Sequence, residues 1–263
     1  PEGKKPLIIS YDDVNYYDYM IEDGFTYKLI IGDDGLIWSY GLDPQGNEVI
    51  SQDLDAITIL DKFVREHPDF SPFGAKGSLS LTGYQGILGY RTNTDTKEWN
   101  DELEANRQKE REAVKPIIAE LKRTGWTFGS HTWGHINVGE ASLERLQTDT
   151  QKWLDYVKPL VGDTNVIIFA FGSDLGDWQP YTSDNEKFAY LKSMGFDIYC
   201  NVDSTQYWVQ FGSDYLRQGR RNLDGYRMYY DLPETNPSKD HLSDLFDVTT
   251  VFDRERPVPV PPM

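Results

Sequence analysis

Residues 126–169 begin with Trp126-Thr127-Phe128-Gly129 and end with Val166-Ile167-Ile168-Phe169, two short apolar runs that are typical of buried strands. Residues 142–160, which lie between them, have the apolar spacing of a helix. A strand, a helix and a second strand in this order predict a parallel β-α-β unit. We also predict strands over residues 7–10, 77–82 and 196–202 and helices over 99–123 and 185–194, with a kink or break at Pro116. The alternation predicts an α/β fold, with a parallel sheet or barrel covered by helices.

The N-terminal part of the chain interrupts this alternation. Residues 27–31 and 36–40 are rich in β-forming side chains and flank the turn Gly32-Asp33-Asp34-Gly35, which predicts a β-hairpin. Ser51 is the expected N-cap of a helix that ends near Glu66. The hairpin and this helix therefore form a local insertion.

Composition limits the function classes. The chain has 263 residues, a length that one α/β barrel commonly reaches, and we expect a single domain over residues 1–263. Cys200 is the only cysteine, which excludes an internal disulfide and any cysteine-rich metal site. A net charge of −17 argues against a nucleic-acid or anionic-membrane partner. No apolar run approaches the roughly 18 residues of a membrane span.

Two of the four histidines, His131 and His135, come directly after the strand predicted over residues 126–129. A spacing of four places both imidazoles on one side of a helical turn, where they can bind one metal ion. The alternative is that the two rings cap the end of the strand or pack with Trp133 in an aromatic cluster.

Asp12 and Asp13 follow the strand predicted over residues 7–10. Because the C-terminal ends of parallel strands meet at one edge of a sheet, these carboxylates and the two histidines are expected at the same edge. One carboxylate and two imidazoles leave an open position for water on zinc, and a second carboxylate can take a proton from that water. By itself, the acidic pair is also typical of a solvated loop.

Two motifs resemble a known family. Ser10-Tyr11-Asp12-Asp13 resembles the Thr-Phe-Asp-Asp that ends the first strand of polysaccharide deacetylases, the family-four carbohydrate esterases. Residues 130–135 resemble the His-Ser/Thr-x-x-His motif of the same family. The resemblance extends over about residues 7–203 and implies a distorted (β/α) barrel of about seven units, here with an inserted β-hairpin near the N-terminus.

The resemblance also implies roles for these residues. Asp13, His131 and His135 would bind a divalent metal, with Zn²⁺ expected and Co²⁺, Ni²⁺ or Mn²⁺ as alternatives. Asp12 would be the general base that takes a proton from the metal-bound water, while the metal polarises the acetyl carbonyl.

A third family motif contains an arginine that orients the base. It corresponds here to residues 169–172, which keep Phe171 and Gly172 but lack the arginine. Arg220 or Arg221 is a candidate replacement, and the alternative interpretation is that both are exposed loop residues.

The remaining candidate residues are expected from their positions. Phe171, Gly172, Trp133 and Asp203 are expected to contact substrate, and Asp203 matches the position of the family's next acidic motif better than Asp174 does. The late histidine that acts as general acid in the family has no clear counterpart. His241 is expected at the surface, and His67 is expected to be structural.

The resemblance therefore implies a metal-dependent deacetylase that acts on an N-acetylated or O-acetylated glycan such as peptidoglycan. The alternative is a catalytically impaired relative that keeps the metal and binds glycan. An acetylated glycan is the expected partner, with no nucleic acid and no membrane span. An extracellular or cell-surface location is expected, with a signal or anchor lying outside the sequence.

Overall fold

The computed structural model describes residues 3, 7–21, 24–43, 45–93, 100–176, 179–202, 207–235 and 241–255. Within these residues the main sheet has seven strands in the order β1-β5-β6-β7-β8-β10-β9. The strands are β1 (Ile9–Tyr11), β5 (Gly77–Leu81), β6 (Trp126–Ser130), β7 (Val166–Ile168), β8 (Ile198–Val202), β10 (Leu216–Arg220) and β9 (Trp208–Phe211). All neighbours pair in parallel except β9, which is antiparallel to β10.

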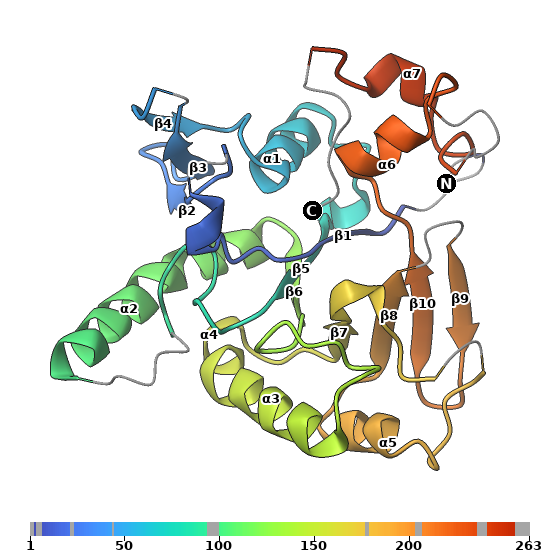
Figure 1. Ribbon diagram of the computed structural model, residues 1–263. Helices are drawn as coiled ribbons and strands as arrows, with labels where there is room; N and C mark the ends of the chain where they lie inside the picture. The colour runs from blue at the N-terminus through green and yellow to red at the C-terminus, as the bar shows by residue number, and fades with distance from the viewer. Residues whose placement is uncertain are drawn as a thin grey trace.

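The sheet curls strongly. The strands turn from a nearly horizontal β1 to upright β10 and β9 in Figure 1. As a result, Arg220 of β10 donates a hydrogen bond to Ser10 of β1 at 2.8 Å, although four strands lie between them in the sheet order. The expected α/β fold, a distorted barrel, is confirmed. One difference is that β9 and β10 are joined as an antiparallel hairpin instead of through a helix.

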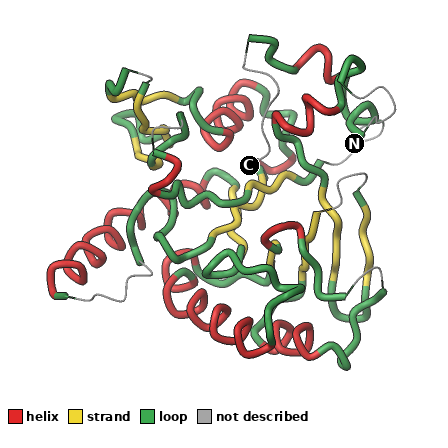
Figure 2. Tube along the Cα trace, viewed as in Figure 1, coloured by secondary structure: helices red, strands yellow, loops and turns green. Residues whose placement is uncertain are grey.

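Four helices connect the parallel strands and pack on the sheet (red in Figure 2). They are α2 (Asp101–Arg123), α3 (Leu143–Tyr156), α4 (Lys158–Val161) and α5 (Glu186–Ser193). Side chains of Asn100, Ser142 and Asn185 cap α2, α3 and α5 by accepting backbone N–H groups. Apolar residues of α2, such as Leu121, share a core cluster with Trp126 and Phe128 of β6.

Of the kink or break expected at Pro116, the break is wrong, because α2 continues through this residue. Pro116 lies on the exposed side of the helix, whereas its neighbours Ile117 and Ile118 are buried. Burial of these side chains offsets the backbone hydrogen bond that proline cannot donate. Trp99, where the sequence placed the start of this helix, lies outside the described residues.

The insertion is larger than the expected hairpin. A separate antiparallel sheet contains β2 (Lys28–Ile31), β3 (Ile37–Leu42) and β4 (Glu48–Ser51), followed by α1 (Ala56–Glu66). Ser51 is the last residue of β4, so its assignment as N-cap was wrong. Asp55 caps α1 instead, with its Oδ1 accepting the Ile57 N–H at 2.8 Å.

The C-terminal part forms a small lobe beyond β10. It contains α6 (Gly225–Tyr230) and α7 (Val248–Val251), which pack through Leu232, Val248 and Phe252. Short 3-10 turns occur at η1 (Asp18–Met20), η2 (Pro72–Gly74) and η3 (Ala170–Gly172). Among the helices of the described ranges, none has the length and apolarity needed to cross a membrane.

Candidate metal centre

The candidate site lies where several strands of the main sheet end. Asp12 and Asp13 follow β1, and His131 follows β6. The strand between them, β5, pairs Leu79 with Tyr11 and Leu81 with Ser130. The parallel register therefore brings the two motifs to the same edge although they are far apart in the sequence.

Three side chains meet at this edge. One ligand atom from each of Asp13, His131 and His135 lies within 4.8 Å of the others. The Nε2 atoms of His131 and His135 are each 3.6 Å from Oδ2 of Asp13. The three residues that the sequence singled out as metal ligands are thus brought together around one point.

The backbone fixes which nitrogen of His131 faces this point. Its Nδ1 lies 2.8 Å from the carbonyl oxygen of Ile168, the last residue of β7. A carbonyl only accepts hydrogen bonds, so Nδ1 carries the hydrogen and Nε2 of the neutral ring has a lone pair directed at Asp13. Metal-binding histidines are commonly oriented in this way.

The second carboxylate oxygen of Asp13, Oδ1, accepts a hydrogen bond from Tyr17. Tyr17 donates its hydroxyl hydrogen to Oδ1 of Asp13 at 2.8 Å, and the same hydroxyl lies 2.7 Å from Oγ1 of Thr82. Oδ2 of Asp13 is left facing the two imidazoles. The backbone of Asp13 is left-handed, with φ of 58°, a conformation that aspartate tolerates better than most residues.

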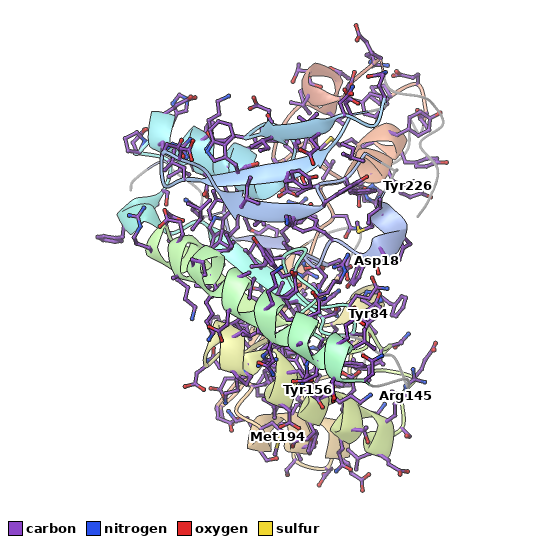
Figure 3. All side chains as sticks on the ribbon, turned by 90° about the vertical axis from the view of Figure 1, so that its left-hand side faces the viewer. Asp18, Tyr84, Arg145, Tyr156, Met194 and Tyr226 are labelled. Carbon is purple, nitrogen blue, oxygen red and sulfur yellow. The ribbon has the colours of Figure 1, made fainter. Side chains whose placement is uncertain are left out.

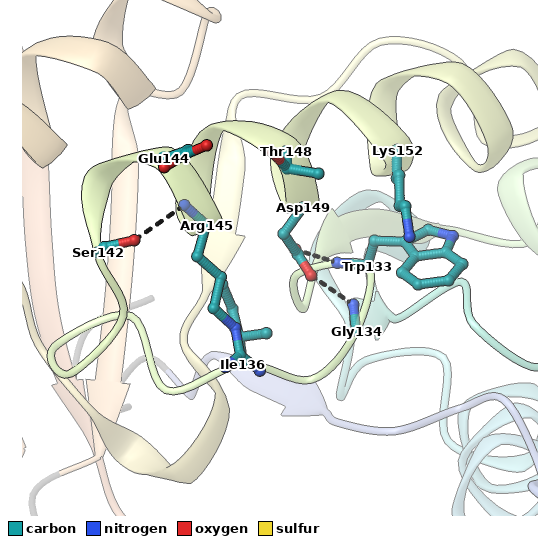
Figure 4. A pocket seen from close by; sticks show the side chains of 9 residues that line it. All are labelled: Trp133, Gly134, Ile136, Ser142, Glu144, Arg145, Thr148, Asp149 and Lys152. Carbon is teal, nitrogen blue, oxygen red and sulfur yellow. Dashed lines mark hydrogen bonds between the residues drawn. The ribbon is translucent and has the colours of Figure 1, made fainter. Parts of the chain in front are cut away.

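The histidine motif is not the helical turn that its spacing suggested. Residues 131–135 form a tight loop in which Thr132 and His135 are left-handed, with φ of 63° and 50°. Asp149 of α3 holds this loop, because its carboxylate accepts the N–H groups of Trp133 at 2.6 Å and Gly134 at 2.8 Å (Figure 4). The two rings reach one point through this clamped loop.

Asp12 lies beside the three ligands and is bound by Arg220 at both oxygens. Nη1 of Arg220 is 3.0 Å from Oδ1 and Nη2 is 2.7 Å from Oδ2. Ser80 of β5 donates a further hydrogen bond to Oδ1 at 3.0 Å. Asp12 is therefore not a freely solvated loop residue, and the exposed-loop interpretation of the arginine pair is wrong for Arg220. Arg221 instead pairs with the exposed Asp244.

The carboxyl groups and imidazoles influence each other's ionisation. Burial raises the pKa of Asp12, but Arg220, His131 and Ser80 together lower it by more, so the net pKa lies below its usual value. Burial likewise raises the pKa of Asp13, and the two imidazoles more than compensate. Burial lowers the pKa of His131, but the two carboxylates raise it above its usual value. For His135 burial prevails and the pKa is lowered.

The four residues expected to contact substrate have different surroundings in the structure. Phe171 is 68% exposed, and its ring centroid lies 4.6 Å from that of His135. Gly172 has a positive φ and lies close to Val202, so a side chain would not fit there. Trp133 is buried, with Lys152 4.1 Å above its ring (Figure 4). Asp203 lies outside the described residues.

The other two histidines have contacts elsewhere. Nδ1 of His241 lies 3.0 Å from Oδ1 of the buried Asp231, so this ring is half-buried in the C-terminal lobe and not at the free surface. The His67 ring packs against Phe63, in keeping with a structural role. Neither contact involves the three metal-ligand candidates.

Sequence reasoning missed Tyr17 and Asp149, and it ranked Asp174 behind Asp203. Asp174 forms an ion pair with the buried Arg217 and accepts a hydrogen bond from Tyr181. Tyr17 lies only four residues after Asp13, so the sequence alone could have indicated it as a hydrogen-bond donor to this carboxylate. Asp149 had no such signal, because its role depends on how α3 packs against the histidine loop.

No protein-family model matches the chain, and no curated protein matches it either. Among solved structures, a crystal structure of PuuE allantoinase is similar, with a TM-score of 0.33 and 11% sequence identity. The similarity covers 70% of this chain and 53% of the allantoinase chain, so this chain spans about half the length of that protein. A likeness this distant assigns no function.

Proposed function

We propose that this protein is a metal-dependent hydrolase that removes acetyl groups from an N-acetylated or O-acetylated glycan. The observation that carries the proposal is the meeting of Asp13, His131 and His135 at one point, with Asp12 fixed beside them by Arg220. The resemblance of the two motifs to polysaccharide deacetylases supports the same activity.

The donor set fits a divalent ion such as Zn²⁺, with Co²⁺, Ni²⁺ or Mn²⁺ as alternatives. Imidazole nitrogen and carboxylate oxygen are both common zinc ligands, and three protein ligands are typical of catalytic zinc sites. Nε2 of each histidine and Oδ2 of Asp13 would hold the ion. When bound, such an ion supplies a Lewis acid that lowers the pKa of a bound water and polarises a carbonyl.

Asp12 is the candidate proton acceptor. Among the described residues, its Oδ1 accepts two hydrogen bonds, from Ser80 and Arg220, whereas Oδ2 accepts one, from Arg220. A carboxylate oxygen has two lone pairs, so Oδ2 keeps one with which to take a proton from an attacking water. Arg220 holds the Asp12 carboxylate in one orientation through its two hydrogen bonds.

The proposal extends to the acetyl group, the charge of the glycan and the location of the protein. Phe171 presents an exposed apolar ring beside His135, where the methyl of an acetyl group would find an apolar contact. The net charge of −17 favours a neutral glycan over an anionic polymer. An extracellular or cell-surface location belongs to the same proposal, because acetylated glycans of this kind are found there.

A second candidate is a relative that binds metal and glycan without turnover. It is favoured by the placement of the two remaining histidines, since His241 is bound to Asp231 and His67 is packed on Phe63. Neither offers an imidazole that could protonate the leaving group at the site.

The test measures acetate release from acetylated chitopentaose by the zinc-loaded protein. We expect release by the wild type, loss of release in Asp12→Asn, and the same zinc stoichiometry in both, because Asp12 is not one of the three ligands. Retained zinc would also show that the variant is folded at the site. A wild type that binds zinc and releases no acetate would favour the second candidate, and one that binds none of Zn²⁺, Co²⁺, Ni²⁺ and Mn²⁺ would contradict both.

A further inference from the structure

Three tyrosines form a compact stack beside the candidate metal centre. The ring of Tyr17 lies parallel to those of Tyr19 and Tyr84, with centroid distances of 5.2 and 5.1 Å and interplanar angles of 16° and 17°. Tyr17 is buried and donates its hydroxyl hydrogen to Asp13. This tyrosine stack (Tyr17, Tyr19 and Tyr84) is therefore joined directly to a metal-ligand candidate.

The outer ring of the stack is open to solvent. Tyr19 is 64% exposed, although one face of its ring rests on Tyr17. Tyr84 is half-buried and meets the buried Trp133 edge-on. Burial, and to a lesser extent the charge of Asp13, raise the pKa of Tyr19.

The segment that carries the stack is tightly anchored. Arg91 donates hydrogen bonds to Oδ1 of Asp18 at 2.6 and 3.0 Å and to the Tyr16 carbonyl at 2.8 Å. Gln85 accepts the Asp18 N–H at 2.9 Å, which ties the turn that carries Tyr19 to the loop that carries Tyr84; Asp18 and Tyr84 are labelled in Figure 3. An exposed aromatic surface on a fixed backbone loses little entropy when a ligand packs on it.

Two exposed rings therefore lie near the ligand candidates. Tyr19 stacks on Tyr17, which bonds Asp13, and Phe171 packs against His135. We propose that the exposed face of Tyr19, backed by Tyr17, forms a sugar-binding subsite that packs on a ring of the glycan next to the acetylated one. This inference rests on the proposed function and names the part of the glycan that the protein recognises.

The chemistry favours a neutral sugar ring. The C–H face of a pyranose is apolar and flat enough to pack on an aromatic ring, while tyrosine hydroxyls can bond the hydroxyls at its rim. Arg91 is already paired with Asp18, so this cation is not free to bind an anionic ligand. A chain of neutral sugars fits both the rings and the charges.

The test measures binding of acetylated chitopentaose by calorimetry. All proteins carry zinc and the Asp12→Asn substitution, so that turnover does not interfere. We expect Tyr19→Ala to weaken binding roughly three- to tenfold and Tyr19→Phe to stay within about twofold of its parent, because the ring supplies most of the contact. The matched control is Phe211→Ala, which removes a ring that is 78% exposed at the opposite end of the sheet, beside Leu216.

The outcomes separate the subsite from the hydrolase. Equal affinity of the parent and Tyr19→Ala, equal losses in Tyr19→Ala and Phe211→Ala, or no binding by the parent would each overturn the subsite. Acetate release by the wild type is measured separately. If the wild type releases acetate and Tyr19→Ala binds the glycan with unchanged affinity, the subsite is rejected and the hydrolase proposal is kept. A weakened Tyr19→Ala without any acetate release supports the subsite and rejects the hydrolase.

Discussion

Arg220 and Asp12 form a two-point ion pair across the curled sheet, with N–O distances of 3.0 and 2.7 Å, although 208 residues separate them. The same guanidinium also binds Ser10 of β1. The planar fork of arginine matches the two oxygens of a carboxylate, so the pair fixes the orientation of Asp12 as well as its charge. One side chain therefore links the last parallel strand to the first and positions the candidate base.

Replacing Arg220 by Met should lower the free energy of unfolding by about 2 kcal/mol, because Asp12 loses two charge-assisted hydrogen bonds in a partly buried place. Arg220→Lys should recover part of the stability but little activity, since an ammonium cannot bind both oxygens in a fixed plane. Urea unfolding and acetate release measure the two effects.

The control for this prediction is Arg254→Met. Arg254 pairs with Glu234, both side chains are more than half exposed, and such pairs contribute about 1 kcal/mol or less. Equal destabilisation by the two substitutions would show that the Arg220 pair has no special role.

Asp149 is predicted to determine the geometry of the metal site without touching a metal. Asp149→Ala leaves the N–H groups of Trp133 and Gly134 without their acceptor and should cost about 3 kcal/mol of folding stability. Zinc affinity should fall as well, because the loop that presents both imidazoles is no longer clamped. Asp155→Ala, on an exposed position of the same helix, should change neither quantity. Wild-type zinc affinity in a folded Asp149→Ala protein would contradict the clamp.

His135→Ala should sharply reduce the zinc content of the purified protein, because one of three ligands is removed. Elemental analysis after dialysis gives the stoichiometry. His67→Ala serves as the control, since that ring packs on Phe63 at the end of α1. The same zinc content in His135→Ala and wild type would remove this residue from the site.

Stability should depend on pH through Asp55. Burial raises the pKa of this carboxyl above its ordinary value of 3.8, so above that pH the folded protein binds the proton more tightly than the unfolded chain. The contribution of Asp55 to stability therefore falls as pH rises from about 3.8 through the folded pKa. Asp55→Asn keeps a capping oxygen and loses this titration. Its stability relative to wild type should increase over that range.

Asp34 serves as the comparison for Asp55, because its pKa is shifted in the opposite direction. Hydrogen bonds from the Leu36 N–H and the Trp38 indole lower the pKa of Asp34, so its stabilising effect is present at higher pH and is lost as pH falls. Asp34→Asn should therefore lose stability relative to wild type as pH rises from strongly acid values. Denaturant titrations at several pH values test both signs, and parallel curves for both variants would contradict the assignment.

The alternation of apolar runs and the parallel sheet it implies were readable from the sequence, and so was the edge at which polar residues gather. Asp12, Asp13, His131 and His135 follow strand ends, and parallel strands bring such positions together regardless of their distance in the chain. Local signals were less reliable, because the cap of α1 moved from Ser51 to Asp55 and the histidine motif proved to be a loop.

The tertiary structure alone decided which partners complete the site. Arg220 and Arg221 are adjacent and chemically identical, and only the curl of the sheet and the place of β10 beside β8 turn Arg220 towards Asp12 and Arg221 towards Asp244. Arg220 is the last residue of β10 and Arg221 begins the loop that follows, so a single position separates the arginine that binds the candidate base from one that binds the C-terminal lobe. The clamp by Asp149 and the tyrosine stack likewise arise from packing between segments whose contacts no local pattern encodes.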